Sequence, residues 1–521
     1  MSSTSLSWFK SLFKTSFLIG LSKVAGFIRD LVIAAFFGTS KAADAFNFAY
    51  LFTGNIFILL GGLNGPFHSA VVTTLSHIQS GIAPDIAKRK QSRFLSKLFL
   101  IVLCFFCILA IALFFAKNSL LHLIIPNNDS LSSAVSKQVN FMIPVFIMSG
   151  IIGVLFGAVS FKKHYFWPSL SPLLTSVTLV CLIFIGYKSL GEWVLGIGTS
   201  LGALVQTVVQ IIDFFNSEYK FDISNFKAEY DDLKYFVWIL MPALLSSTIG
   251  SLNVYVDSFF CAGLEEGSWT AILMANRLIQ LPFGILVGSS LVSFLPKIAN
   301  LKEDKLSFIS TLYRELINLL YLLIPATAII LALSKPLIEL LFLRGEFDTH
   351  SSHLVNLALL GLAVSLITSL PREIYTRAFY AIGDSKTPFI VSLISIIWNA
   401  LLDWILSAKF QVAGIAMSTT LTALINSLLL IFLFKQKFSF SFNFDWLKCI
   451  QYLFIGFACY LISSTSFQVL RSLQFLPSIK FSFIDINTTI RFLIAVVLGL
   501  FTYLAVTLCV RKMTKSEIMK N

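Results

Sequence analysis

Three cations lie inside long apolar stretches of the sequence, where a helix that crosses a bilayer rarely carries charge. Lys23 and Arg29 fall in the stretch 16–37, and Arg277 falls in the stretch 270–296. A charge at the bilayer centre costs about 2.5–3.5 kcal/mol, which suggests that these cations line a wet internal cavity. A cationic cavity binds anions, and the planar donor fork of arginine suits phosphate oxygens. The cations therefore predict an internal site for an anion of about the size of a diphosphate.

Carboxylates accompany these cations in the sequence. Asp30 follows Arg29 directly, and Asp44 precedes the second apolar stretch. Lys23 and Arg29 are six residues apart, about 120° around an ideal helix, and a bend at Gly26 would bring both toward one cavity. A structural alternative stays open, in which Lys23 reaches the membrane surface and each arginine only neutralises a nearby carboxylate.

A second group of side chains offers oxygen ligands for a metal cation. Asp257 lies in one apolar stretch, Asn399 and Asp403 lie four residues apart in another, and Thr419 lies in the next. Carboxylate, amide and hydroxyl oxygens, with a backbone carbonyl near Ile415, are the ligands that a hard cation such as sodium needs. Hydrogen-bonded packing between helices would use the same residues, so the spacing alone leaves both interpretations open.

The elements that position these residues are membrane-spanning helices. Of 521 residues, 57% are hydrophobic and 12% are charged, and the mean hydropathy is +0.85. The apolar stretches are continuous rather than alternating, which favours helices over a barrel. We expect an all-α polytopic membrane protein with about 14 transmembrane helices, near 16–37, 45–75, 94–116, 139–160, 167–187, 190–215, 234–262, 270–296, 307–334, 353–380, 387–407, 411–434, 448–466 and 489–511.

The polar stretch 216–233 divides the first twelve spans into six and six. Two six-helix lobes around a central cavity are a recurrent transporter plan, so we expect an N-terminal lobe over 1–220 and a C-terminal lobe over 234–436. Two additional helices would follow over 445–521. The glycine-rich segment 61–66 interrupts the second span and predicts a helix break, because a phosphate-binding loop would need a Lys-Ser/Thr pair after it.

The net charge of +13 is explained by its distribution along the chain. Lys and Arg concentrate in alternate connections, such as Lys88, Arg89 and Lys90 after the second span, which marks those connections as cytoplasmic. An even number of spans then places both termini in the cytoplasm. This distribution leaves no need for a nucleic-acid partner. A charged turn over 371–388 also falls on the cytoplasmic side.

At these residues the chain resembles the MurJ (MviN) family of lipid II flippases, within the multidrug/oligosaccharidyl-lipid/polysaccharide exporter superfamily. The residues that carry the resemblance form an ordered set along the whole chain: Ser22 to Asp30, Phe37-Gly38, Asp44-Ala45-Phe46, Ala275-Asn276-Arg277-Leu278, and Arg377 to Pro388. The chain departs from the family in the second span, where Phe57-Ile58-Leu59 stands near the usual charged residues, and at Asn276, where Asp is common.

The resemblance implies a flippase that moves lipid II, the undecaprenyl-diphosphate-linked peptidoglycan precursor, across the bacterial cytoplasmic (inner) membrane. Transport from the inner to the outer leaflet would proceed by alternating access and serve peptidoglycan biosynthesis, cell wall biogenesis and cell shape. The resemblance implies that Lys23, Arg29, Asp30, Asp44 and Arg277 bind the substrate. The last two spans would hold its polyprenyl tail. The implied partners are lipid II, membrane lipids and the peptidoglycan synthesis machinery, and a sodium ion or the membrane potential, rather than ATP, would drive the cycle.

Three alternative functions stay open on the sequence. An exporter of another polyprenyl-linked glycan would use the same cationic cavity. A cation-coupled drug antiporter would need a cavity rich in carboxylates, against which Lys23, Arg29 and Arg277 argue. A membrane-embedded glycan-lipid transferase would need a base or nucleophile on a sizeable polar loop, and the external loops offer little. We therefore expect a transporter rather than an enzyme.

Overall fold

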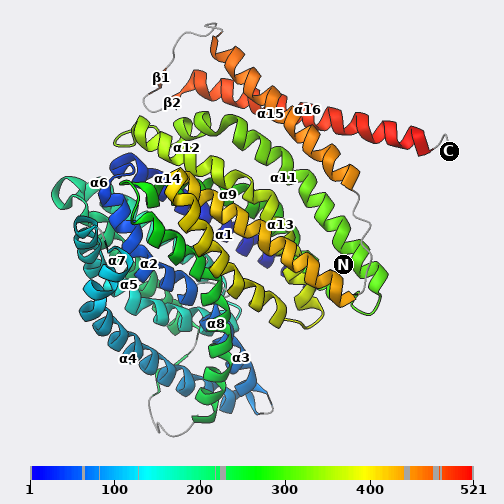
Figure 1. Cartoon of the computed structure of the whole chain (residues 1–521). Helices are drawn as coiled ribbons and strands as arrows, with labels where there is room; N and C mark the ends of the chain where they lie inside the picture. Colours follow the sequence, from blue (N-terminus) through cyan, green and yellow to red (C-terminus); the bar gives the residue numbers. More distant parts are fainter. Residues whose placement is uncertain are drawn as a thin grey trace. The chain divides into compact units, whose positions relative to one another are not determined.

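The computed structural model describes the whole chain except residues 1–2, 62–64, 81, 127, 218, 223–229, 439–445, 473–479, 482–483 and 519–521. The expected all-α class is confirmed, since helices make up nearly all of the described chain (Figure 1). Its described strands are the two-residue segments β1 (Lys480–Phe481) and β2 (Ile484–Asp485), which pair antiparallel before the last helix.

The chain forms two compact units, Met1–Glu266 and Gly267–Asn521. The first contains α1 (Ser3–Phe37), α2 (Lys41–Gly61), α3 (Pro66–Gln79), α4 (Pro84–Ile124), α5 (Asp129–Phe161), α6 (Phe166–Leu190), α7 (Trp193–Asn216) and α8 (Tyr230–Cys261). The second contains α9 (Ser268–Phe283), the π-helical turn η1 (Gly284–Gly288), α10 (Ser289–Ala299), α11 (Lys305–Phe342), α12 (Thr349–Ala363), α13 (Ser365–Ala381), α14 (Lys386–Phe438), α15 (Trp446–Ser472) and α16 (Ile486–Ile518). The lobe limits expected from the sequence, which assign the span 234–262 to the second lobe, remain a prediction.

Local sequence explains where these helices begin and end. Gly38 follows α1 with a φ of 56°, a left-handed conformation that glycine adopts at little cost. Pro66 and Pro84 stand in the first turns of α3 and α4, where a missing N–H is tolerated. Asn128 precedes α5, and its side chain accepts a hydrogen bond from Leu131 N at 2.9 Å. The expected break at residues 61–66 falls between α2 and α3, although Gly62, Leu63 and Asn64 lie outside the described residues.

Aromatic packing forms the core where α3, α4 and α8 meet. The Phe67 ring lies 6.3 Å from the Phe106 ring and 6.1 Å from the Phe236 ring, both in edge-on arrangements that aromatic pairs favour. Close backbone packing brings α3 onto α5, since a Cβ added at Gly157 would lie only 2.5 Å from Cβ of Val71. A larger residue at 157 would therefore force these two helices apart.

The 53-residue α14 is a helical hairpin rather than one span. At 1.5 Å per residue it would extend about 80 Å as a straight helix, well beyond the roughly 30 Å hydrocarbon core. Gln411 interrupts it with φ 52° and ψ −129°. Gly414 then packs against the first half, because a Cβ there would lie 2.2 Å from the Leu406 carbonyl oxygen. This element corresponds to the two spans expected over 387–407 and 411–434.

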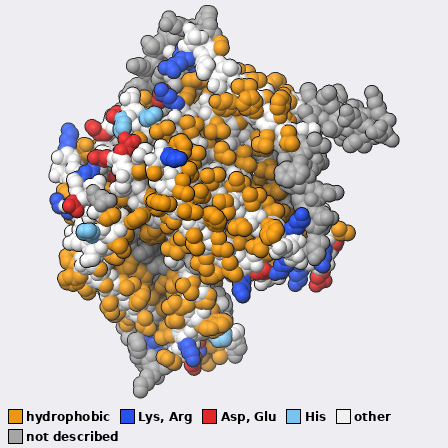
Figure 2. Space-filling view, viewed as in Figure 1, with side chains coloured by type: hydrophobic (Ala, Val, Ile, Leu, Met, Phe, Trp, Pro, Cys, Tyr) orange, Lys and Arg blue, Asp and Glu red, His pale blue; other side chains and the backbone are white. Residues whose placement is uncertain are grey.

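The described residues contain nine helices that are long and apolar enough to cross a membrane, or ten if the bent pair α12 and α13 counts as one span. This number is lower than the roughly 14 spans expected from the sequence, partly because α14 is counted as one helix although it contains two apolar halves. The face drawn in Figure 2 is covered mostly by hydrophobic side chains. Strongly exposed examples include Ile185 at 81% and Trp404 at 66%, as expected for side chains that face lipid. The expected number of spans stays a prediction.

The last two long helices, α15 and α16, run side by side (Figure 1). A Cβ at Gly499 of α16 would lie 2.0 Å from Ser463 Oγ of α15, so the two backbones approach closely there. The pair packs on α11, where the buried Tyr503 hydroxyl donates to the Tyr321 carbonyl at 2.9 Å.

Candidate functional site

Arg29 forms an ion pair with Asp30 inside α1. Its Nε and Nη2 donate to Oδ1 of Asp30 at 3.0 and 2.7 Å, and the two side chains are only 18% and 20% exposed. Neighbouring residues on a helix point in different directions, so the guanidinium folds back along the helix to reach this carboxylate. Tyr50 of α2 also interacts with Arg29. The sequence analysis did not single out Tyr50, and its only signal is its place one helical turn before Gly54, whose missing side chain leaves room for the Tyr50 ring.

Lys23 lies on a different side of α1. The helix includes Gly26 without a break, so Lys23 and Arg29 keep their separation of about 120° around it. The Lys23 side chain is exposed, whereas the neighbouring Ser22 hydroxyl donates to the Ser169 carbonyl of α6 at 2.8 Å. In this conformation the structure does not bring the two cations of α1 onto one face.

Asp44 lies in the first turn of α2 and is only 3% exposed. The positive end of the helix dipole stabilises a carboxylate at this position. Nearby, the Lys41 backbone N–H donates to Glu266 Oε1 at 2.5 Å, and the Lys41 ammonium donates to Ser130. Asp44 is therefore placed to stabilise the start of α2, and its contact with a substrate remains a prediction.

In the second unit, Arg277 lies on an exposed stripe of α9. Gln280, Leu281, Gly284 and Gly288 follow at helical spacing and are also exposed. A Cβ at either glycine would meet no atom within 4 Å. The last two positions belong to the π-helical turn η1, a rare geometry that often occurs at functional sites. Arg277 thus lies beside an exposed surface of the second unit on which two glycines carry no side chain.

The two halves of α14 carry four of the five expected sodium ligands, and their assembly into one site remains a prediction. Asn399 and Asp403 are 1% and 0% exposed, and the Asn399 amide donates to Asp403 Oδ2 at 3.1 Å. In the second half, the Thr419 hydroxyl donates to the Ile415 carbonyl at 3.1 Å. The Ser418 hydroxyl donates to the Asn399 carbonyl at 3.3 Å and so links the two halves.

Ser418 is a residue that the sequence analysis missed. Small or polar residues recur every four positions on this buried face, at Gly414, Ser418, Thr422 and Asn426, and that periodicity was the available signal. Asp257 is 8% exposed and belongs to the first unit, on α8. Its participation in one site with the residues of α14 remains a prediction. Among the described residues, His, Cys, Asp and Glu do not gather in groups of three.

The turn between α13 and α14 is tied to the far end of the α14 hairpin. Gly383 adopts a φ of 79° in this turn, and Asp384 accepts from Thr387 N at 3.0 Å and from the Thr387 hydroxyl at 2.8 Å. The Lys437 ammonium also donates to Asp384. Burial by itself would raise the pKa of Asp384, but these hydrogen bonds and the Lys437 charge lower it to about 2. The turn is therefore held by a carboxylate that stays ionised at neutral pH.

The apolar helices, the charges within them and the two helical units define a polytopic helical transporter. Its fold matches a solved lipid II flippase MurJ in an inward closed conformation, with a TM-score of 0.77 and 22% identity over 96% of this chain and 99% of that one. An inward-facing multidrug resistance MATE family transporter of the MOP superfamily matches with a TM-score of 0.65 and 15% identity, over 81% of this chain and 94% of that one.

Sequence comparison identifies the family. Residues 33–483 match the profile of the lipid II flippase MurJ family. A probable lipid II flippase MurJ from Synechocystis is 30% identical over 441 residues, which cover 82% of this chain and 81% of the relative. The chain belongs to the MurJ lipid II flippase family. It is accordingly a multi-pass transporter of the bacterial cytoplasmic membrane, and the expected family and fold are confirmed.

Proposed function

We propose that this chain translocates lipid II from the inner to the outer leaflet of the cytoplasmic membrane by alternating access, for peptidoglycan biosynthesis. The observation that carries the proposal is the largely buried Arg29–Asp30 pair within the apolar helix α1 of a MurJ family member. A structural ion pair would be cheaper to replace by apolar side chains. A site that must bind and release a diphosphate explains why the charges are present.

The cations would bind the diphosphate of the substrate when the cavity is open to the cytoplasm. Arg29 forms an ion pair with Asp30 at 2.7 Å, and the side chains of Arg277 and Lys23 are exposed, so phosphate oxygens could reach them. Charge-assisted hydrogen bonds from guanidinium groups are among the stronger polar interactions. Asp30 would keep Arg29 oriented between cycles and compete with the phosphate, which favours release after the cavity reopens on the other side.

A sodium ion fits the donor atoms of α14. The carboxylate of Asp403, the amide of Asn399, the hydroxyl of Thr419 and the carbonyl of Ile415 are oxygen donors of the kind that sodium prefers, and Asp257 would complete the set. The ion would supply a positive charge that offsets the buried Asp403. Its binding would bias the equilibrium between the two states of the transporter.

The close packing of α15 on α16 and of both on α11 supports a role for these helices in holding the polyprenyl tail. Exposed apolar side chains on the pair, such as Phe454 at 71% and Phe501 at 70%, offer a surface of matching polarity. The same proposal places both termini in the cytoplasm. Its partners are membrane lipids and the peptidoglycan synthesis machinery. Export of another polyprenyl-linked glycan is the remaining alternative, because it needs the same cations.

The proposal is tested by Arg29→Ala and Arg277→Ala in a strain depleted of its own flippase. We expect each change to abolish growth and to leave labelled lipid II in the inner leaflet, while protein levels stay normal. Lys335→Ala removes a cation of α11 whose side chain is 69% exposed, and we expect it to support normal growth. Full growth and normal leaflet distribution with both arginine variants would refute the cavity site.

A further inference from the structure

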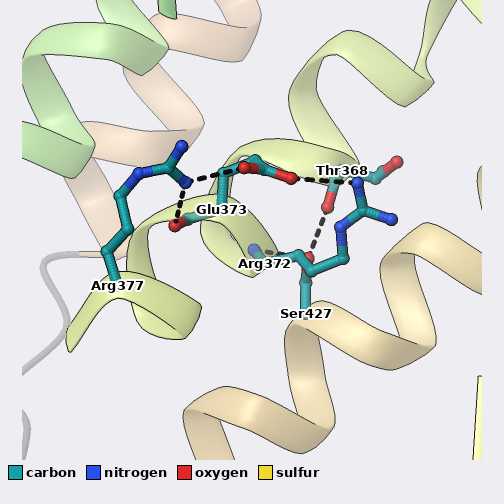
Figure 3. Close-up of polar contacts among 5 residues, drawn as sticks. All are labelled: Thr368, Arg372, Glu373, Arg377 and Ser427. Atoms are coloured by element: carbon teal, nitrogen blue, oxygen red, sulfur yellow. Dashed lines mark hydrogen bonds and ion pairs between the residues drawn. The ribbon is translucent and has the colours of Figure 1, made fainter. Parts of the chain in front are cut away.

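A hydroxyl from α14 bonds to two backbone groups of one turn of α13. Ser427 Oγ accepts from the Arg372 backbone N–H at 3.1 Å and donates to the Thr368 carbonyl at 2.5 Å (Figure 3). These are the two backbone groups that pair directly in a regular turn. Pro371, inside the same turn, has no N–H to donate. The Ser427 hydroxyl and the proline hold the local backbone and thereby the direction of the side chains that follow.

Directly after this turn, one carboxylate holds two guanidinium groups. Glu373 Oε1 accepts from Arg372 Nη2 at 3.0 Å, and its Oε2 accepts from Arg377 Nη1 at 2.7 Å. Arg377 Nη1 also donates to the Glu373 carbonyl at 2.9 Å. Figure 3 shows the two guanidinium groups on either side of the carboxylate. Each carboxylate oxygen thus holds one arginine.

This triad carries one net positive charge, because a single carboxylate balances only one of the two arginines. The side chains of Arg372, Glu373 and Arg377 are 41%, 28% and 29% exposed. Each guanidinium has five N–H donors, and the bonds to Glu373 use only part of them. A net positive charge at a membrane surface attracts the phosphates of anionic lipids. Within the described part of the chain, the triad therefore presents N–H donors beyond those bonded to Glu373, and one net positive charge, at an accessible surface.

The position of the triad fits the headgroup region of the predicted inner leaflet. Arg377 lies four residues and Arg372 nine residues before the end of α13 at Ala381, which is about 6 and 14 Å along a helix. Tyr380, at the same end, is 47% exposed, as is common for tyrosines at a membrane interface. Phosphate groups of lipids are the anions that occur at this depth.

We propose that Arg372 and Arg377, held apart by Glu373, form a second anion site on the second unit, which binds the phosphate of a membrane lipid near the predicted cytoplasmic surface. Two lipids carry this chemistry. One is the polyprenyl diphosphate of the transported substrate, for which the triad would be a docking site before entry. The other is an anionic phospholipid such as phosphatidylglycerol. The first case rests on the proposed function, and the second does not.

Binding to the purified full-length chain tests the site. The chain carrying Arg29→Ala and Arg277→Ala, which lacks the main cations of the proposed transport site, is placed in phosphatidylcholine nanodiscs. It is then titrated with undecaprenyl diphosphate or with phosphatidylglycerol, and bound lipid is measured by native mass spectrometry. We expect Arg372→Gln and Arg377→Gln each to weaken binding about tenfold, the loss of one charge-assisted hydrogen bond. Lys335→Gln is the matched control and should leave binding unchanged.

Glu373→Gln separates a binding site from a structural ion pair. If the arginines bind phosphate, removal of the competing carboxylate raises the net charge and tightens binding several-fold. If the triad only stabilises α13, the same change weakens the fold and tightens nothing. Binding that is insensitive to both arginine changes, or that weakens with Glu373→Gln, would overturn the proposal. A third outcome is that only the binding of phosphatidylglycerol depends on the triad, and that of undecaprenyl diphosphate does not. This outcome would support the anion site and assign it to a structural lipid. It would leave the proposed lipid II transport untouched.

Discussion

Several side chains in this protein are both charged and buried, a combination that helix packing alone does not require. Arg29 and Asp30 are both largely buried in α1, and Asp403 is fully buried in α14. Burial of charged groups costs free energy unless they are paired or bind ions. Their retention in a member of a transporter family is best explained by ligands that come and go. Substitution of such a residue should therefore change the response of the protein to its ligand.

Asp403→Asn should remove a sodium response while preserving the fold. The amide is nearly isosteric and keeps an acceptor for Asn399, but it lacks the charge that holds a cation. We expect the melting temperature of the wild-type chain to rise when sodium chloride replaces choline chloride, since a ligand that binds only the folded state stabilises it. The variant should show little or no rise.

Asp304→Asn is the control for that experiment. Asp304 caps α11 in the same unit by accepting from Ser307 N at 3.2 Å, and its substitution lowers stability without touching α14. Its sodium response should equal that of the wild type. An equal response in the Asp403 variant would remove the sodium assignment and leave the Asn399–Asp403 bond as helix packing.

Helices and their connections were predicted unevenly from the sequence. Continuous apolar stretches located most long helices. The four-residue spacing predicted that Asn399 and Asp403 share one helix face, where the structure joins them by a hydrogen bond. The reversal at Gln411 was not predicted as a left-handed residue, because it depends on packing of Gly414 against Leu406 rather than on local preference. No local sequence feature predicted the hydrogen bonds of Ser427 to α13, since they join residues 55 or more positions apart.

The connection between α13 and α14 should show a defined dependence on pH. The pKa of Asp384 is about 2 in the folded chain and 3.8 ordinarily. A carboxylate whose pKa falls on folding stabilises the native state fully above the unfolded pKa, and that contribution is lost as the pH falls toward the folded pKa. Asp384→Asn should therefore lower the melting temperature at about pH 7, and the difference from wild type should shrink between about pH 4 and pH 2.

Thermal unfolding of detergent-solubilised protein across this pH range measures the difference. Lys437→Gln should reproduce the effect, because it removes the ammonium that donates to Asp384. Lys335→Gln should change little at any pH, since its partner Glu339 lies 4.0 Å away in a mostly exposed pair. A constant difference between wild type and Asp384→Asn over the whole range would show that the carboxylate charge does not hold this turn.

The molecule as a whole divides its charges between two units. Lys23, Arg29 and Asp30 belong to the first, and Arg277 belongs to the second. Family membership and fold could be predicted from ordered motifs along the chain, and both are confirmed. Whether Asp257 and Asp403 belong to one site could not be predicted from the sequence. It depends on packing between elements of different units, whereas sequence spacing informs only about residues within one helix.

The membrane potential should therefore act on transport through these cations. If the empty transporter carries them part of the way across the field when it resets, each charge gains up to about 2.3 kcal/mol per 100 mV. An inside-negative potential would favour return to the cytoplasm-facing state. Translocation of labelled lipid II in proteoliposomes, at potentials set by potassium gradients and valinomycin, should accelerate as the interior becomes more negative. Lys23→Gln removes one exposed cation and should flatten this dependence, whereas Lys335→Gln should preserve it. An identical voltage slope in the wild type and the Lys23 variant would show that this cation does not move through the field and would leave ion binding at α14 as the driving step.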